Sequence, residues 1–171
     1  MDYVARLASP VGELTLASDG ETLTGLWIAG QKYPSAGLGL ESREVRLPVF
    51  EAAADWLDRY FSGKCPEPDE LPLAPRGSDF RRSVWRLLLE IPSGEVRSYG
   101  EIARSLGASA RAVGGAVGHN AVSILIPCHR VVGTGGSLTG YAGGLDRKIR
   151  LLELEKADMS RLYIPKKGTV L

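Results

Sequence analysis

The sequence predicts an α+β fold in two parts, a small antiparallel sheet with one helix followed by a mostly helical part. Residues 3–28 alternate apolar and polar side chains between turn signals, which is typical of half-buried strands. The stretch from Cys65 to Arg76 holds four prolines, and beyond it apolar residues recur at helical spacing. We therefore predict an N-terminal domain at 1–64, a linker at 65–77 and a C-terminal domain at 78–171.

Composition indicates a globular protein. With 171 residues, 44% of them hydrophobic and 24% charged, the chain can bury a full core. No apolar run reaches the length of about 18 residues that a membrane helix needs, and the N-terminus has no hydrophobic signal core. We expect a cytoplasmic protein in which Cys65 and Cys128 are free thiols.

Charge is divided unequally along the chain. Residues 1–75 carry 6 Lys and Arg against 12 Asp and Glu, and residues 76–171 carry 15 against 8, so the halves have net charges of −6 and +7. Clustered basic residues release counterions when they meet phosphates, so the second half suits a polyanion. The alternative is an ordinary solvated surface.

The N-terminal pattern predicts a three-stranded antiparallel meander at residues 3–8, 13–18 and 23–28, then an irregular connection at 29–47. After Pro48, apolar side chains recur at helical spacing until Ser62-Gly63 ends the helix. These side chains are Val49, Phe50, Ala53, Trp56, Leu57, Tyr60 and Phe61. No cluster of catalytic residue types occurs here, so this part should support the other.

The C-terminal domain should begin with a helix capped by Ser78 and ended by Pro92. Its predicted apolar face is Phe80, Val84, Leu87, Leu88 and Ile91.

A helix-turn-helix pattern follows. Residues 99–106 and 110–117 are predicted helices, joined at Gly107. Gly114 and Gly115 lie within the second helix, where each glycine costs about 1 kcal/mol relative to alanine. They make sense if a groove comes very close, and the narrow minor groove of DNA would suit a small-residue helix that reads little sequence. Tight packing of two helices is the alternative.

Residues Ile124 to Val132 hold the most unusual local chemistry. Three aliphatic residues predict a buried strand, and Pro127 should bend the chain so that Cys128 lies on a short helical or turn conformation. A thiol beside a base or a cation can become a reactive thiolate, and His129 and Arg130 could provide that help. The alternative is that Cys128 is a small buried hydrophobic residue. Asn120 lies in the preceding connection, from which it could reach a reactive residue.

Beyond the cysteine, Gly133–Ser137 should be a flexible turn, and 138–144 a glycine-rich loop able to wrap a flat ligand. Residues 145–157 predict a final helix, in which Glu153 or Glu155 could reach His129. Its expected inward side chains are Leu145, Ile149, Leu151 and Leu152, and its outward ones Lys148, Arg150 and Lys156. The tail from Asp158 should be loosely held.

Taken together, these motifs resemble the O6-alkylguanine-DNA alkyltransferases, also called methylated-DNA protein-cysteine methyltransferases. The resemblance runs from about Phe80 to Glu155, and residues 1–75 fit the variable N-terminal domain of that family. It implies a ribonuclease H-like N-terminal domain and a winged helix-turn-helix-like C-terminal domain. The matching segments are Arg111-Ala112-Val113-Gly114-Gly115-Ala116, Asn120, Ile126-Pro127-Cys128-His129-Arg130-Val131 and Tyr141-Ala142-Gly143-Gly144-Leu145.

The resemblance implies a DNA repair function. Cys128 would take the alkyl group from O6-alkylguanine, or O4-alkylthymine, in a single irreversible turnover. His129 would deprotonate Cys128 through a water and be held by Glu155, Asn120 would fix the turn, and Tyr99 would help to turn out the nucleotide and donate to the base.

It also implies how DNA is held. Arg111 would replace the extruded nucleotide in the stack, and the helix would lie in the minor groove. Other implied DNA-binding residues are Tyr99, Arg81, Ala112, Gly114, Gly115 and Thr134. Tyr141 would cover the base, and Ala142, Val131 and Val117 would complete the pocket. The family often has serine at the position of Ala142, which leaves a side-chain contact in doubt.

The resemblance implies a monomer without a cofactor. We expect no metal, because the Cys and His set that holds zinc in some relatives is missing here. The alternatives are a helix-turn-helix regulator without transferase activity, a cysteine hydrolase, and an alkyltransferase-like protein that binds lesions without repair. A regulator would need more polar side chains on its second helix, hydrolase Cys and His residues are usually far apart in sequence, and the last class lacks the cysteine.

Overall fold

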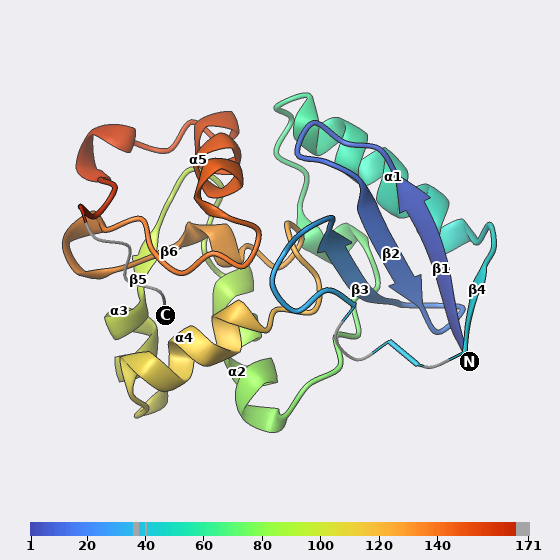
Figure 1. Ribbon diagram of the computed structural model, residues 1–171, viewed down its shortest axis with the longest axis horizontal. Helices are drawn as coiled ribbons and strands as arrows, with labels where there is room; N and C mark the ends of the chain where they lie inside the picture. Colours follow the sequence, from blue (N-terminus) through green and yellow to red (C-terminus); the bar gives the residue numbers. More distant parts are fainter. Residues whose placement is uncertain (36–37, 40, 167–171) are drawn as a thin grey trace.

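The computed structural model describes residues 1–35, 38–39 and 41–166. The N-terminal part is a four-stranded sheet in the order β3-β2-β1-β4 (Figure 1). Strands β1 (Asp2–Leu7), β2 (Leu14–Ser18) and β3 (Leu23–Ile28) form the predicted antiparallel meander. The expected irregular connection contains a short strand, β4 (Ser42–Glu44), which pairs in parallel with β1. All three β4 residues are exposed, so no apolar alternation marked this strand in the sequence.

Helix α1 (Pro48–Phe61) lies along one face of the sheet (Figure 1). Its buried side chains are Val49, Phe50, Ala53, Trp56, Leu57 and Tyr60, as the spacing predicted, while the seventh predicted side chain, Phe61, is half-buried at the end of the helix. Pro48 occupies the first turn, where its missing N–H costs nothing, and Ser62 is the C-cap.

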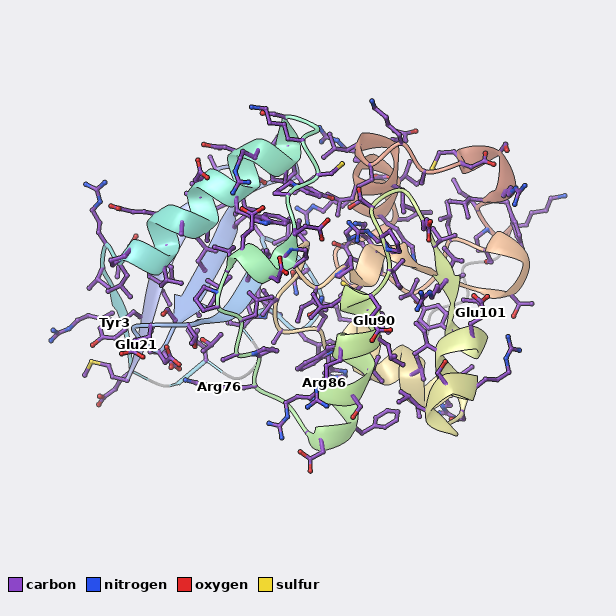
Figure 2. All side chains as sticks on the ribbon, turned by 180° about the vertical axis from the view of Figure 1, so that it is seen from behind. Tyr3, Glu21, Arg76, Arg86, Glu90 and Glu101 are labelled. Atoms are coloured by element: carbon purple, nitrogen blue, oxygen red, sulfur yellow. The ribbon has the colours of Figure 1, made fainter. Side chains whose placement is uncertain are left out.

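The proline-rich stretch is attached to the sheet. The Leu23 N–H donates to Pro72, the Ala74 N–H donates to Leu23, and the Leu71 side chain is buried. Arg76, labelled in Figure 2 between the sheet and the next helix, forms an ion pair with Asp2 at 2.6 Å. The stretch contains only a short 3-10 turn, Pro68–Glu70, and no α-helix, as four prolines dictate, yet it is bonded to the sheet.

Helix α2 (Asp79–Leu89) begins at Ser78, whose hydroxyl accepts from the Arg81 N–H as a cap should. The predicted apolar face was partly wrong. Phe80 is 38% exposed, while Trp85 is buried and donates its indole N–H to Ala116. Since successive helical residues turn by about 100°, a buried face that extends from Val84 towards Trp85 leaves Phe80 at its margin. Arg86 on this helix and its C-cap, Glu90, are labelled in Figure 2, and both are exposed.

The predicted pair of helices is confirmed. Helix α3 (Tyr99–Leu106) starts with a reciprocal capping box between Ser98 and Glu101, and Gly107 ends it at φ 61°. Helix α4 (Ala110–Gly118) is capped by Ser109. Strand β5 (Arg97–Ser98) pairs in parallel with β6 (Val131–Val132).

The strand predicted at residues 124–126 is wrong. These residues are fully buried, yet they form turns, with Ile124 at φ 72°. Local bonds satisfy the backbone, since the Leu125 N–H donates to Ser123 and the Ile126 N–H to Val122. Just before these turns, Leu26 of β3 exchanges backbone hydrogen bonds with Ala121 and Ser123. This segment therefore joins the two halves.

Helix α5 (Leu145–Leu154) is followed by a short 3-10 turn, Met159–Arg161. The beginning of the tail is more firmly held than predicted, because Tyr163 exchanges backbone bonds with Leu138 and Gly136. Lys167 and Gly168 lie outside the described residues. One hydrophobic cluster contains buried side chains from both halves. In the described part of the chain, no helix is long and apolar enough to cross a membrane.

Candidate active site

Cys128 opens a single 3-10 turn, Cys128–Arg130, directly after Pro127, which confirms the predicted local conformation. Its side chain is only 3% exposed. The Asn120 amide donates to the Cys128 sulfur at 3.1 Å and to the Ile126 carbonyl at 2.8 Å. Asn120 therefore contacts the thiol and fixes the buried turn before it. Cys65 and Cys128 are both free thiols, as expected.

The resting thiol of Cys128 is protonated. Burial raises its pKa, and this effect outweighs the hydrogen bond from Asn120 and the positive charge of Lys148, which both favour the thiolate. Reaction at this sulfur consequently requires a base to remove the proton.

His129 can be that base. It is fully buried, and its Nε2 lies 2.7 Å from Glu155 Oε1. Burial lowers the pKa of the imidazole and outweighs the opposite effect of Glu155, so the ring is neutral at pH 7. The neutral ring carries its proton on Nε2 and donates a hydrogen bond to the carboxylate, so Nδ1 keeps its lone pair. Nδ1 has no hydrogen-bond partner among the described residues.

Glu155, the C-cap of α5, is at the centre of a buried hydrogen-bond network. The predicted contact with His129 is part of it, but the network has more members than predicted. Besides His129, Glu155 accepts hydrogen bonds from the Tyr60 hydroxyl at 2.7 Å and from two nitrogens of Arg130. Burial would raise the pKa of the carboxyl, but His129 and Arg130 hold it well below its usual value. Arg130, the second candidate for help to Cys128, binds Glu155 and the Ile91 carbonyl instead.

Lys148 was predicted to face outward, and this prediction is wrong. The side chain is fully buried, and its ammonium group donates to the carbonyl oxygens of Val131 at 2.5 Å and Thr139 at 2.9 Å. Burial lowers its pKa to about 8. Lys148 lies three residues after Leu145 and three before Leu151, so the helical spacing that placed those leucines inward also placed Lys148 there.

A cavity of about 1050 Å³ opens beside this network. Seven of the predicted site residues line it: Tyr99, Arg111, Gly114, Gly115, Thr134, Tyr141 and Ala142. Among the described residues, Cys128 is not part of this lining, whereas its neighbour Lys148 is. The thiol is therefore not exposed in the cavity, although it interacts electrostatically with three of the lining residues, Tyr99, Tyr141 and Lys148.

The remaining predicted residues do not line the cavity. Val117 and Val131 are buried, Ala112 is exposed on α4, and Arg81 is half-buried on α2. Within residues 1–35, 38–39 and 41–166, no group of three or more His, Cys, Asp and Glu side chains could hold a metal ion.

Two tyrosines face the cavity from different elements. The Tyr99 hydroxyl is 3.1 Å from the Thr139 carbonyl and 3.4 Å from that of Gly140. The Tyr141 hydroxyl is buried and has no partner among the described residues. Burial raises the pKa of both phenols, so both are hydrogen-bond donors at neutral pH.

Two features of the site could not have been found from the spacing of catalytic residue types. Tyr60 comes from α1, where the sequence indicates only a core helix, and two consecutive residues of the connection after β3, Lys32 and Tyr33, also line the cavity. The only signal for Tyr60 is its hydroxyl at an otherwise apolar position, which requires a partner when buried.

Comparison with known proteins covers both halves. Residues 79–157 match the family model described as 6-O-methylguanine DNA methyltransferase, DNA binding domain, and residues 3–75 match its ribonuclease-like domain. A methylated-DNA--protein-cysteine methyltransferase of Mycobacterium tuberculosis is 50% identical over 163 residues, covering 92% of this chain and 94% of the relative. One from Haemophilus influenzae is 42% identical over 156 residues, covering 90% and 86%. The crystal structure of Mycobacterium tuberculosis OGT in complex with DNA superposes with a TM-score of 0.81 at 47% identity, covering 94% of each chain.

Proposed function

Because the chain belongs to the 6-O-methylguanine DNA methyltransferase family and repairs DNA by alkyl transfer, we propose that Cys128 is the sulfur that accepts the alkyl group. The substrates would be O6-alkylguanine and O4-alkylthymine. The observation that carries this proposal is the buried series of contacts from Asn120 to Cys128 and from His129 to Glu155, beside a cavity large enough for a base.

The proton of the thiol goes to His129 Nδ1 through a bridging water. The unpaired Nδ1 and the neutral ring support this role. Glu155 then stabilises the imidazolium, while Asn120 and the Lys148 charge favour the thiolate.

The thiolate attacks the alkyl carbon, and the bond from that carbon to O6 breaks with its electron pair remaining on the base. Tyr99, protonated and at the cavity wall, turns its hydroxyl from the Thr139 carbonyl to the leaving oxygen. The product is a thioether that this site has no means of hydrolysing, so each molecule reacts once.

The flipped base enters the cavity. Tyr141 covers it, and its unpaired hydroxyl is available to a polar group of the base. The carbonyls of Val131 and Ala142 already accept one bond each, from Lys148 and from the Lys32 N–H, but each keeps a second lone pair for the edge of the base. Val117, which is buried on α4, would complete the pocket.

DNA would lie along α4, with its minor groove against the small-residue face and Arg111 in the place of the extruded nucleotide. A Cβ added at Gly115 or Gly118 would meet nothing within 4 Å, so packing inside the protein does not require glycine there. This favours an external groove over tight helix packing. Ala112, Gly114, Thr134 and Arg81 complete the DNA face of a monomer acting in the cytoplasm.

The test is intact-mass spectrometry after incubation with duplex DNA containing O6-methylguanine. The protein should gain one methylene, since a methyl group replaces the thiol proton, and peptide mapping should place it on Cys128. Cys128→Ala should gain nothing, and the matched control Cys65→Ala should behave as the wild type. DNA binding without any mass gain would instead identify a helix-turn-helix regulator, and more than one product per protein would exclude a single-turnover acceptor.

A further inference from the structure

The loop that carries Tyr141 is held in place by hydrogen bonds that its backbone carbonyl oxygens accept. We call residues 139–144 the pocket loop. The Tyr99 hydroxyl and the Lys148 ammonium approach the Thr139 carbonyl, and Arg147 Nη1 lies 3.4 Å from the Gly143 carbonyl. These three donors come from α3 and α5 of the C-terminal half, and they hold both ends of the loop.

The middle of the pocket loop is held from the other half of the protein. The Lys32 N–H donates to the Ala142 carbonyl at 2.9 Å. Lys32 itself is fixed by the preceding residue, because the buried Gln31 side chain accepts from the Ile28 N–H at 2.7 Å and from the Ser123 hydroxyl at 3.3 Å. A rigid segment after β3 therefore sets the position of Ala142.

The next residue, Tyr33, contacts the end of α4, which also lines the cavity. The Tyr33 ring stacks on His119, with centroids 4.0 Å apart and planes inclined by 20°. His119 is the C-cap of α4, and its Nδ1 lies 2.8 Å from the Gly115 carbonyl. Tyr33 has φ 57°, which is unfavourable for a residue with a Cβ, so the stacking contact helps to hold a strained backbone.

Lys32 and Tyr33 together span the cavity from the pocket loop to the end of α4, and both line it. We propose that this pair, the clasp, determines the size of the alkyl group that the site accepts, by limiting how far Ala142 can move away from α4. The inference rests on the proposed alkyl transfer to Cys128. It assigns a specificity-determining role to two residues outside the reaction centre.

Loss of the clasp should affect transfer of a small alkyl group and of a bulky alkyl group differently. Without the clasp, the ends of the pocket loop stay bonded to Lys148 and Arg147, so a methyl group is still transferred. A bulky group needs the extra width that movement of Ala142 provides. The rate ratio of bulky to small substrate is therefore the quantity that reports on the clasp.

The experiment compares Tyr33→Ala with Tyr33→Phe, which keeps the stacking ring. Single-turnover rate constants are measured on the same duplex carrying O6-methylguanine or O6-benzylguanine. The benzyl-to-methyl ratio should rise about tenfold in Tyr33→Ala, the low end of what one group in an apolar pocket contributes to discrimination, and should not change in Tyr33→Phe. His119→Ala should raise the ratio as well, and the double variant no further, since both changes remove one contact.

Amide hydrogen exchange at Lys32 is a readout independent of activity, and it should be faster in Tyr33→Ala than in Tyr33→Phe. An equal ratio in the Ala and Phe variants, or equal slowing of both substrates in Tyr33→Ala, would overturn the clasp while leaving alkyl transfer to Cys128 intact. Wild-type protein that gains no alkyl group from either duplex would overturn the proposed function and this inference with it.

Discussion

At the scale of single residues, the Glu155 carboxylate connects the two halves of the protein, because it accepts a hydrogen bond from Tyr60 of α1. It is buried, and Tyr60, His129 and Arg130 all donate to it. A buried carboxylate is stable only while such donors replace its lost hydration. Each donor should therefore affect stability as well as reactivity.

Tyr60→Phe tests the donor from the N-terminal half. Loss of a hydrogen bond to a charged group should lower the free energy of unfolding by about 1.5–3 kcal/mol, measured by urea titration at pH 7. It should also slow methyl transfer, because Glu155 holds His129. Tyr163→Phe, at a position 51% exposed, is the matched control and should change little. Equal effects of the two substitutions would show that the Tyr60 hydroxyl does not support the carboxylate.

Glu155→Gln tests the charge through pH. The folded-state pKa of Glu155 lies below its ordinary value of 4.5, so its stabilising contribution is complete above about pH 4.5 and declines as the pH falls further. The variant should lose about 3 kcal/mol at pH 7, and its deficit relative to the wild type should shrink toward pH 3. Glu153→Gln, exposed on the same helix, is the control. A deficit that stays constant from pH 7 to pH 3 would exclude the ionised carboxylate as its source.

Residue identity alone predicted some of these partners and not others. Cys128 and His129 were found because a proline, a thiol and an imidazole interrupt an apolar run, a pattern that core packing does not require. Asn120 was a candidate because it lies in the connection before that run, and only the resemblance to a known family singled out Glu155 over Glu153. Tyr60 and Lys148 were missed. A tyrosine in a core helix and a lysine at an inward position are usually assigned to packing and to solvent, and only the fold shows which carboxylate or carbonyl they meet.

At the scale of elements, α4 combines low helix propensity with an exposed small-residue face. Gly115→Ala should raise the free energy of unfolding by about 0.5–1 kcal/mol, because alanine favours the helix and the added methyl meets nothing in the protein. The same methyl should weaken DNA binding severalfold if this face enters the minor groove. Urea unfolding and fluorescence anisotropy at fixed salt measure the two effects. A variant that is more stable and binds DNA as tightly as the wild type would show that α4 does not enter the minor groove.

Element boundaries were predictable where the signal is local. Ser78, Ser98 and Ser109 each cap the helix that follows, because a side-chain oxygen three residues before an N–H needs no tertiary contact. The buried turns at residues 124–126 were not predictable. An apolar run indicates burial, but strand formation depends on a pairing partner, and here the partner strand β3 bonds to Ala121 and Ser123 instead.

At the scale of the whole molecule, the two halves share one core and one site, although their opposite net charges suggest separate roles. Leu26 joins the sheet to the turns before Cys128, Lys32 holds the pocket loop, and Tyr60 holds Glu155. A fragment of residues 78–171 would expose the apolar surface that packs on the sheet and would leave Glu155 without one donor. We therefore expect it to lack a cooperative urea transition and to transfer methyl groups far more slowly than the full chain, with partial recovery on addition of a fragment of residues 1–77. A sharp unfolding transition and full transfer activity in residues 78–171 alone would show that the N-terminal half is dispensable to the site, and that the contacts from Tyr60 and Lys32 carry no functional weight.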